Sequence, residues 1–198
     1  MSVTSTAQAS SSHRQKMWLD RSFDGWKKSA WWLCLLIILP LAFAIKFKLA
    51  FNMTPSLKFK VAVIEKGLQP TNHNDLVAYR WHGGASIPAG LEMVKRVVGM
   101  KGEQIELVAL AASEDEPASL RVYAHEVVLR RATGQEYARF KAKQFAKNGK
   151  PLAPIDSQVI RRGEYFVTAD HPDSLDSRYA VTGLIHADQV IGKVVWSW

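Results

Sequence analysis

A serine and a lysine are the residues of this chain best suited to nucleophilic chemistry. Ser56 lies in the stretch NMTPSLKF, and Lys95 lies in MVKRVVG. A serine hydroxyl attacks a carbonyl when a base takes its proton, and a lysine can be that base if burial lowers the pKa of its amine. On a strand, Met93, Lys95 and Val97 would share one face. A turn serine and a solvent-facing strand lysine are the alternatives that these stretches leave open.

Other catalytic groups have little support in the sequence. The chain has six histidines, but it has no G-x-S-x-G motif, no H-E-x-x-H motif and no paired histidine spacing. A Ser-His-Asp triad is therefore unsupported. The single cysteine, Cys34, excludes an intrachain disulfide, a cysteine zinc cluster and a dithiol redox motif. We expect neither a metal nor a cofactor.

The elements that must position Ser56 and Lys95 are short and strand-like over residues 52–198. Seven or so stretches show strand patterning, namely FKVAVIE, DLVAYRW, EMVKRVVG, EQIELVAL, LRVYAHEVVL, EYFVTAD and QVIGKVVWSW. We predict a mainly β domain, either an antiparallel β sandwich or a partly open barrel. Residues 131–157 are predicted to be an insertion, in which one short helix could end at Gly149.

Residues 29–51 form the most apolar part of the chain and are predicted to be a transmembrane helix. The sixteen residues from Ala30 to Ile45 carry no charge, and a span needs about 20 residues, which the run reaches if it continues to Phe51. Tryptophans cluster at its start, as expected at a membrane interface. A cleavable secretory signal is the alternative, because residues 42–44 fit the A-x-A cleavage pattern.

The net charge of +8 and the pI near 9.6 come from basic residues on both sides of the apolar run. This arrangement favours attraction to anionic lipid headgroups, and no nucleic-acid-binding motif is present. Five Lys or Arg residues precede the run and four follow it as far as Lys60, so charge slightly favours a cytoplasmic N-terminus. We predict a cytoplasmic tail over residues 1–28 and export of residues 52–198.

Three sequence boxes follow the apolar run in order, namely TPS, VKRVVGMKGE and SLDSRY. The second resembles the K-R-hydrophobic-x-G-x-x-G-[DE] box of the signal peptidase I family of Ser-Lys proteases, through Lys95, Arg96, Gly99, Gly102 and Glu103. The third, at residues 174–179, matches every specified position of that family's S-x-D-S-R-Y box. Within the family, the chain is similar to the TraF-type peptidases of bacterial conjugative transfer.

The resemblance implies a nucleophile, a base and an oxyanion hole. Ser56 would be the nucleophile and Lys95 the general base that takes its proton. The Thr54 hydroxyl and the Ser56 backbone N–H would stabilise the tetrahedral intermediate. The chain departs from the TraF-type pattern after the serine, where residues 57–59 replace the usual proline and glycine, which bears on the shape of the substrate cleft.

The third box implies supporting roles. Ser174 would orient the Lys95 amine through a hydrogen bond, with an ordinary turn residue as the alternative. Asp176 and Arg178 would form an ion pair that holds the loop in place.

The resemblance also implies a place and an activity. The protein would be a single-pass bacterial inner-membrane protein with its N-terminus in the cytoplasm and its catalytic domain in the periplasm. It would be a serine endopeptidase that removes leader peptides from exported precursors, such as a conjugative pilin or another transfer component. The expected partners are that precursor, membrane lipid and conjugative transfer proteins, and not nucleic acid.

Two other functions remain open at this point. One is general signal peptidase activity on secreted proteins, and the other is a non-catalytic assembly factor for conjugation. For the peptidase, two ways of releasing the product from the acyl-enzyme stay open. Water could attack it, or an amine could attack it and cyclise the product.

Overall fold

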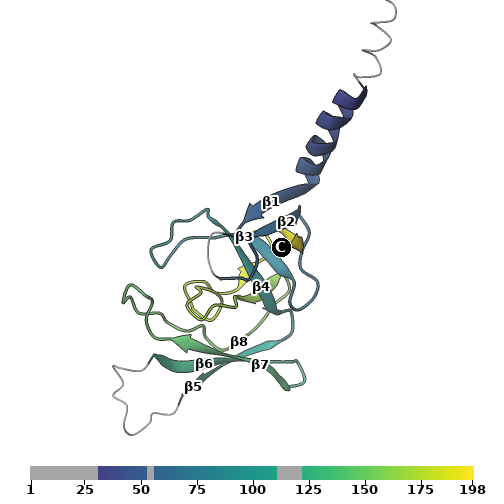
Figure 1. Ribbon diagram of the computed structural model, residues 1–198. Helices are drawn as coiled ribbons and strands as arrows, with labels where there is room; N and C mark the ends of the chain where they lie inside the picture. The colour runs from purple at the N-terminus through teal and green to yellow at the C-terminus, as the bar shows by residue number, and fades with distance from the viewer. Residues whose placement is uncertain (1–30, 53–55, 111–121) are drawn as a thin grey trace, which may run out of the picture. The chain divides into compact units, whose positions relative to one another are not determined.

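The computed structural model describes residues 31–52, 56–110 and 122–198, and the chain divides into two units after Lys46 (Figure 1). Residues 31–46 are helical. In the described part of the chain, no helix is long and apolar enough to cross a membrane. The predicted tail over residues 1–28 and the first two residues of the predicted span lie outside the described residues.

The predicted span does not continue to Phe51, so that part of the prediction is wrong. Residues Phe47–Phe51 form strand β1, which pairs antiparallel along its whole length with β2 (Val61–Lys66). The sequence FKLAF alternates large apolar residues with others, and this period of two is that of a strand. Residues 47–51 are mostly apolar, like the helix before them, but they form a strand because they pair with β2.

The described residues from 47 onward form two antiparallel sheets (Figure 1). The larger sheet has the strand order β1-β2-β11-β3-β4-β9-β10, and the smaller has the order β7-β6-β5-β8. The remaining strands are β3 (Leu76–Arg80), β4 (Glu92–Gly99), β5 (Gln104–Ala109), β6 (Tyr123–Arg130), β7 (Glu136–Lys143), β8 (Gln158–Val159), β9 (Glu164–Thr168), β10 (Ile185–His186) and β11 (Val190–Ser197). The prediction of a mainly β, antiparallel fold is confirmed, and among the described residues neither sheet closes on itself.

The core consists of two clusters of buried apolar side chains, one of which joins the two sheets. The first joins Val127 and Leu129 of the smaller sheet to Phe166 of β9 in the larger sheet. The second contains Val97 of β4 and Val167 of β9, within the larger sheet. Because β9 contributes to both clusters and pairs with β4, the position of β4 is fixed by the core.

The segment over residues 131–157 contains a strand where we expected a helix, and that expectation is wrong. Strand β7 pairs with β6, and Tyr137 and Phe140 pack against the first apolar cluster. The alternation in EYARFKAK fits a strand period, and β6 offers an edge with which it can pair. Residues 136–143 of this segment are therefore part of the smaller sheet.

The structure requires glycine at the two glycine positions of the second sequence box for different reasons. A Cβ on Gly99 would lie 2.7 Å from Ile160 Cδ1 and 2.8 Å from Phe166 Cβ, so the core leaves no room for a side chain there. Gly102 has a φ of +86°, which glycine adopts without steric cost in the turn between β4 and β5. Both glycines thus shape the chain just after Lys95.

The acidic residue of the same box, Glu103, connects several parts of the fold. It accepts hydrogen bonds from Tyr137 Oη at 2.6 Å, Arg131 Nη1 at 2.8 Å and the Met100 backbone N at 2.8 Å, and His73 Nε2 lies 3.0 Å from its carboxylate. Burial alone raises the pKa of Glu103, but the hydrogen bonds outweigh it and hold the pKa below the usual value. A charged Glu103 therefore ties the β4–β5 turn to the smaller sheet.

Candidate active site

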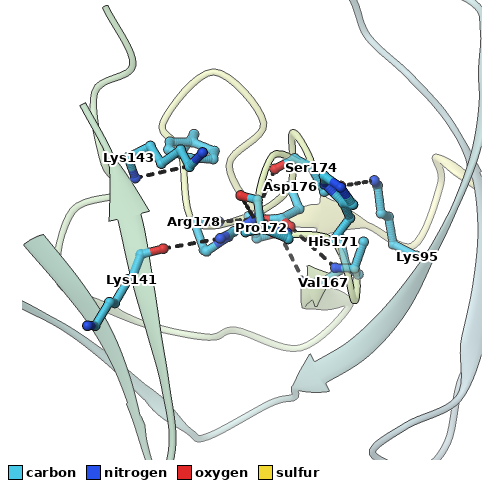
Figure 2. Close-up of polar contacts among 12 residues, drawn as sticks. Lys95, Lys141, Lys143, Val167, His171, Pro172, Ser174, Asp176 and Arg178 are labelled. Carbon is cyan, nitrogen blue, oxygen red and sulfur yellow. Dashed lines mark hydrogen bonds and ion pairs between the residues drawn. The ribbon is translucent and has the colours of Figure 1, made fainter. Parts of the chain in front are cut away.

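Lys95 is buried in β4, with 5% of its surface exposed. Its Nζ donates a hydrogen bond to Ser174 Oγ (Figure 2). Burial lowers the pKa of the Lys95 amine, the negative charge of Asp176 opposes this effect, and the positive charge of Arg178 adds to it. The solvent-facing alternative is therefore wrong, and the amine loses its proton more easily than an exposed lysine does.

The loop that carries Ser174 is held by an ion pair two residues further on. Arg178 Nε lies 2.8 Å from Asp176 Oδ1, and Arg178 Nη2 lies 3.0 Å from Asp176 Oδ2. Arg178 Nη2 also donates to the carbonyls of Ser174 at 3.0 Å and Pro172 at 3.2 Å, while Nη1 donates to that of Lys141 at 3.1 Å (Figure 2). The guanidinium therefore fixes the loop on both sides of Ser174.

Two further hydrogen bonds fasten this loop to the end of β9. The Val167 backbone N donates to Ser177 Oγ at 3.0 Å, and the Ala169 backbone N donates to Asp176 Oδ2 at 3.3 Å. Asp176 and Ser177 are fully buried. Since β9 is the neighbour of β4, these bonds place Ser174 beside Lys95.

Ser56 is half-buried in the segment that follows β1. Its carbonyl accepts a hydrogen bond from the Asp170 backbone N at 3.0 Å. Asn52 Nδ2 donates to the carbonyls of Leu57 at 2.9 Å and Phe59 at 3.0 Å, which brackets the residues just after Ser56. The sequence analysis missed the positioning roles of Asn52 and Asp170, because such contacts with backbone groups leave no motif.

A cleft of about 830 Å³ brings the predicted catalytic residues to one surface. Its lining includes Ser56, Lys95 and Ser174. Most of the remaining lining is apolar, with contributions from residues 49–51 of β1, Phe59, Ile64 and residues 91–94. A mainly apolar cleft with few polar groups is typical of a site that binds a substrate in a defined orientation.

The walls of this cleft include two strand edges that run in the same direction. From β1 through β2, β11 and β3 to β4, each neighbouring pair that the structure describes is antiparallel, so β1 and β4 are parallel to each other. β9 pairs with β4 from Arg96 onward, so within the described residues the stretch 92–95 has no strand partner on that side. β1 is the end strand of its sheet.

An ion pair crosses from one of these strands to the other. Lys48 Nζ of β1 lies 2.5 Å and 2.6 Å from the two carboxylate oxygens of Glu92 at the start of β4. Lys95 comes after Glu92 along β4, and Ser56 follows the end of β1 in the sequence and lines the same cleft as Lys95. The cleft therefore has an end marked by the Lys48–Glu92 pair and an end that holds the candidate catalytic groups.

Of the residues predicted for the site, the structure brings Lys95, Ser174, Asp176 and Arg178 into one hydrogen-bonded group. Ser56 lines the same cleft as Lys95. Thr54, the predicted oxyanion donor, lies outside the described residues. Within the described ranges, no group of three or more His, Cys, Asp or Glu residues could hold a metal ion.

The sequence profile of one family matches most of the chain. Residues 25–198 match the family described as signal peptidase, peptidase S26. No curated protein is similar enough in sequence to be matched to the chain.

The chain therefore belongs to the signal peptidase S26 family. Membership makes it a serine peptidase that removes signal peptides, and its substrate is a precursor protein.

Proposed function

We propose that Ser56 and Lys95 form the catalytic dyad of this peptidase. The observation that carries the proposal is that Lys95 is buried and lines a cleft that Ser56 also lines. Burial lowers the pKa of the Lys95 amine, and a neutral amine has the lone pair that a general base needs. The resemblance of the sequence boxes supports the same two residues.

In the proposed reaction, Lys95 accepts the proton of the Ser56 hydroxyl while Ser56 Oγ attacks the scissile carbonyl carbon. The hydrogen bond from Lys95 to Ser174 holds the amine so that its lone pair is directed away from Ser174. The tetrahedral intermediate then collapses, the C–N bond breaks, and Lys95 gives its proton to the leaving amine. Water attacks the resulting ester on Ser56 and releases the leader carboxylate, which restores the free serine.

The oxyanion hole of the proposal consists of the Thr54 hydroxyl and the Ser56 backbone N–H. Each such donor typically contributes about 100-fold to 1000-fold to the rate. Asp176 and Arg178 hold the loop that bears Ser174, since Arg178 bonds to the Ser174 carbonyl, and their charges act on the Lys95 amine in opposite directions.

The substrate of the proposal is an extended leader peptide that ends in a small residue. We expect the residues before the scissile bond to add as a strand along the edges of β1 and β4, where backbone groups of residues 92–95 lack a strand partner among the described residues. The chain reaches Lys48 two residues after the helix ends, so the Lys48–Glu92 end of the cleft is closest along the chain to the helix. The leader would enter from that end.

We further propose that the protein is anchored in the bacterial inner membrane by the apolar run around residues 29–46, with residues 47–198 in the periplasm. The uncharged stretch from Ala30 to Ile45 and the basic residues around it support this placement. The likeness to TraF-type peptidases supports a conjugative pilin or another transfer component as the precursor. General processing of secreted proteins is the second candidate, because family membership alone fits it equally well.

The test is cleavage of the cognate precursor, and of a broad signal-peptide reporter, by the full chain in detergent. Ser56→Ala and Lys95→Ala should both fold and lose cleavage, while the exposed-residue controls Ser197→Ala and Lys101→Ala should cleave as the wild type does. The mass of the product distinguishes hydrolysis from cyclisation by one water. Normal cleavage by Ser56→Ala or Lys95→Ala would refute the dyad, and normal conjugative transfer with Ser56→Ala would favour an assembly factor.

A further inference from the structure

A second pocket of about 240 Å³ adjoins the catalytic cleft. The two share Ile87, Asp173, Ser174 and Leu175 as lining residues. The second pocket is smaller than the roughly 300–1000 Å³ typical of drug-sized ligands, so it has room for a side chain or two of a peptide. Figure 2 shows Lys143, which lines this pocket, and Lys95 on opposite sides of Ser174. Lys95 lines the cleft but not this pocket, so the pocket adjoins the cleft at Ser174.

Two loops that are fastened to each other line this pocket. One includes Ala85 and Ile87, and the other follows β7 and includes residues 145–148. Lys150 Nζ donates a hydrogen bond to Ser86 Oγ at 2.6 Å, which joins the loops. Ala85 and Ser86 have φ values of 49° and 72°, in the left-handed region that is unfavourable for side-chain-bearing residues. Such conformations persist where the surroundings impose them, often at binding sites.

The rim of the pocket carries an excess of positive charge. Lys143 Nζ and Lys147 Nζ both contact the Asp173 carboxylate, the second at 3.2 Å. The hydrogen bonds from Lys143 and Lys147 lower the pKa of Asp173, which therefore carries one negative charge against two positive ones. The Lys147 side chain is 77% exposed, so its ammonium group can reach a ligand.

We propose that this pocket binds the precursor just after the scissile bond, taking an apolar side chain inside and favouring an acidic neighbour at Lys147. The inference rests on the proposed function, in which the leader occupies the cleft from the Lys48–Glu92 end to Ser56. A substrate in the extended conformation advances about 3.3 Å per residue in one direction. The residues that follow the scissile bond therefore continue past Lys95 and Ser174. The second pocket begins there, because Ser174 lines both spaces.

The test uses the full chain in detergent micelles and four synthetic peptides. Each peptide has alanine at the first and third positions before the scissile bond, and Leu-Glu, Leu-Lys, Ala-Glu or Ala-Lys after it. The wild type should prefer Leu-Glu to Leu-Lys by about 1.5-fold to fivefold in kcat/KM, the range expected for an exposed charge pair. Raising the salt concentration should weaken this preference.

Two variants change the pocket in different ways. Lys147→Glu should reverse the preference between Leu-Glu and Leu-Lys, whereas the matched control Lys101→Glu, in the turn after β4, should keep it. Ala146→Leu fills the pocket and should lower the preference for Leu-Glu over Ala-Glu by about tenfold. Lys147→Glu alters an exposed side chain, so it keeps the test decisive if Ala146→Leu fails to fold.

The outcomes separate this inference from the proposed function. If the wild type shows no preference among the four peptides, or if Lys147→Glu keeps the wild-type preference, the pocket does not bind the segment after the scissile bond. In that case Ser56→Ala would still abolish cleavage of all four peptides, and the dyad would stand. Cleavage that persists in Ser56→Ala would instead refute the dyad, whatever the peptide preferences are.

Discussion

Replacing Ser174 with alanine tests whether the hydrogen bond to Lys95 serves catalysis. The substitution removes the oxygen that accepts the Lys95 N–H, in a place where both side chains are buried. A lost hydrogen bond costs about 0.5–1.5 kcal/mol, and a buried donor left without a partner costs up to about 3 kcal/mol. If this cost falls on the transition state, kcat decreases by about twofold to 150-fold. Loss of the nucleophile in Ser56→Ala should be far larger, about 10⁶-fold.

The matched control is Ser177→Ala, in the same loop. Ser177 is also buried, but its Oγ accepts a hydrogen bond from the Val167 backbone N, whereas Lys95 donates to Ser174. Both variants should lower Tm, whereas only Ser174→Ala should lower kcat, with KM little changed. Ser174→Thr keeps a hydroxyl and should recover part of the loss.

The assay is steady-state cleavage of a fluorogenic leader peptide, with Tm measured on the same samples. Equal kcat values for Ser174→Ala and Ser177→Ala would show that the bond to Lys95 has no part in the reaction. A large rise in KM with unchanged kcat would also contradict the reasoning, because it would place Ser174 in substrate binding.

Three further predictions follow from the described contacts. Burial lowers the pKa of Lys95, and only the neutral amine is a base, so kcat/KM should fall as pH decreases through that pKa. A pH–rate profile should place the midpoint below the value of about 10.4 for a free lysine. Gly99→Ala should lower the free energy of unfolding by about 1–3 kcal/mol, or Tm by about 2–12 °C in calorimetry, since its Cβ would overlap Ile160 and Phe166. Glu103→Gln should lower Tm by about 2–4 °C at neutral pH. Since the folded state lowers the pKa of Glu103, its stabilisation is present above the unfolded pKa and is lost as pH falls through the folded one, so the Tm difference from wild type should shrink in acid.

Local patterning was enough to predict the fold class, but not every element. Most of the longer strands follow from alternating β-branched and apolar residues, as in EMVKRVVG. The two-residue strands β8 and β10 are too short to leave a period in the sequence. The helix expected near Gly149 was wrong because β7 is stabilised by pairing with β6, a contact that the local sequence does not encode.

In the site, too, local sequence patterns predicted some features, whereas features that depend on distant parts of the chain could not be predicted from them. Strand alternation placed Lys95 and Val97 on one face, but it could not decide whether that face was buried. Burial depends on the loop at residues 174–178, which is about 80 positions away and is held by Arg178. The contact between Lys95 and Ser174 was predicted only through the resemblance, since spacing of this length carries no geometric information.

The two end strands of the larger sheet differ in length and in the side chains that they expose. At one end β10 has two residues, which is too short to template another strand. At the other end β1 has five residues and carries exposed Leu49 and Phe51, a combination that favours edge-to-edge aggregation between molecules. Lys48, the second residue of β1, is held by Glu92 and places a charge where an intruding β-strand would have to desolvate it. Lys48→Val should therefore leave the fold intact and make the purified protein more prone to self-association, which light scattering against concentration would detect.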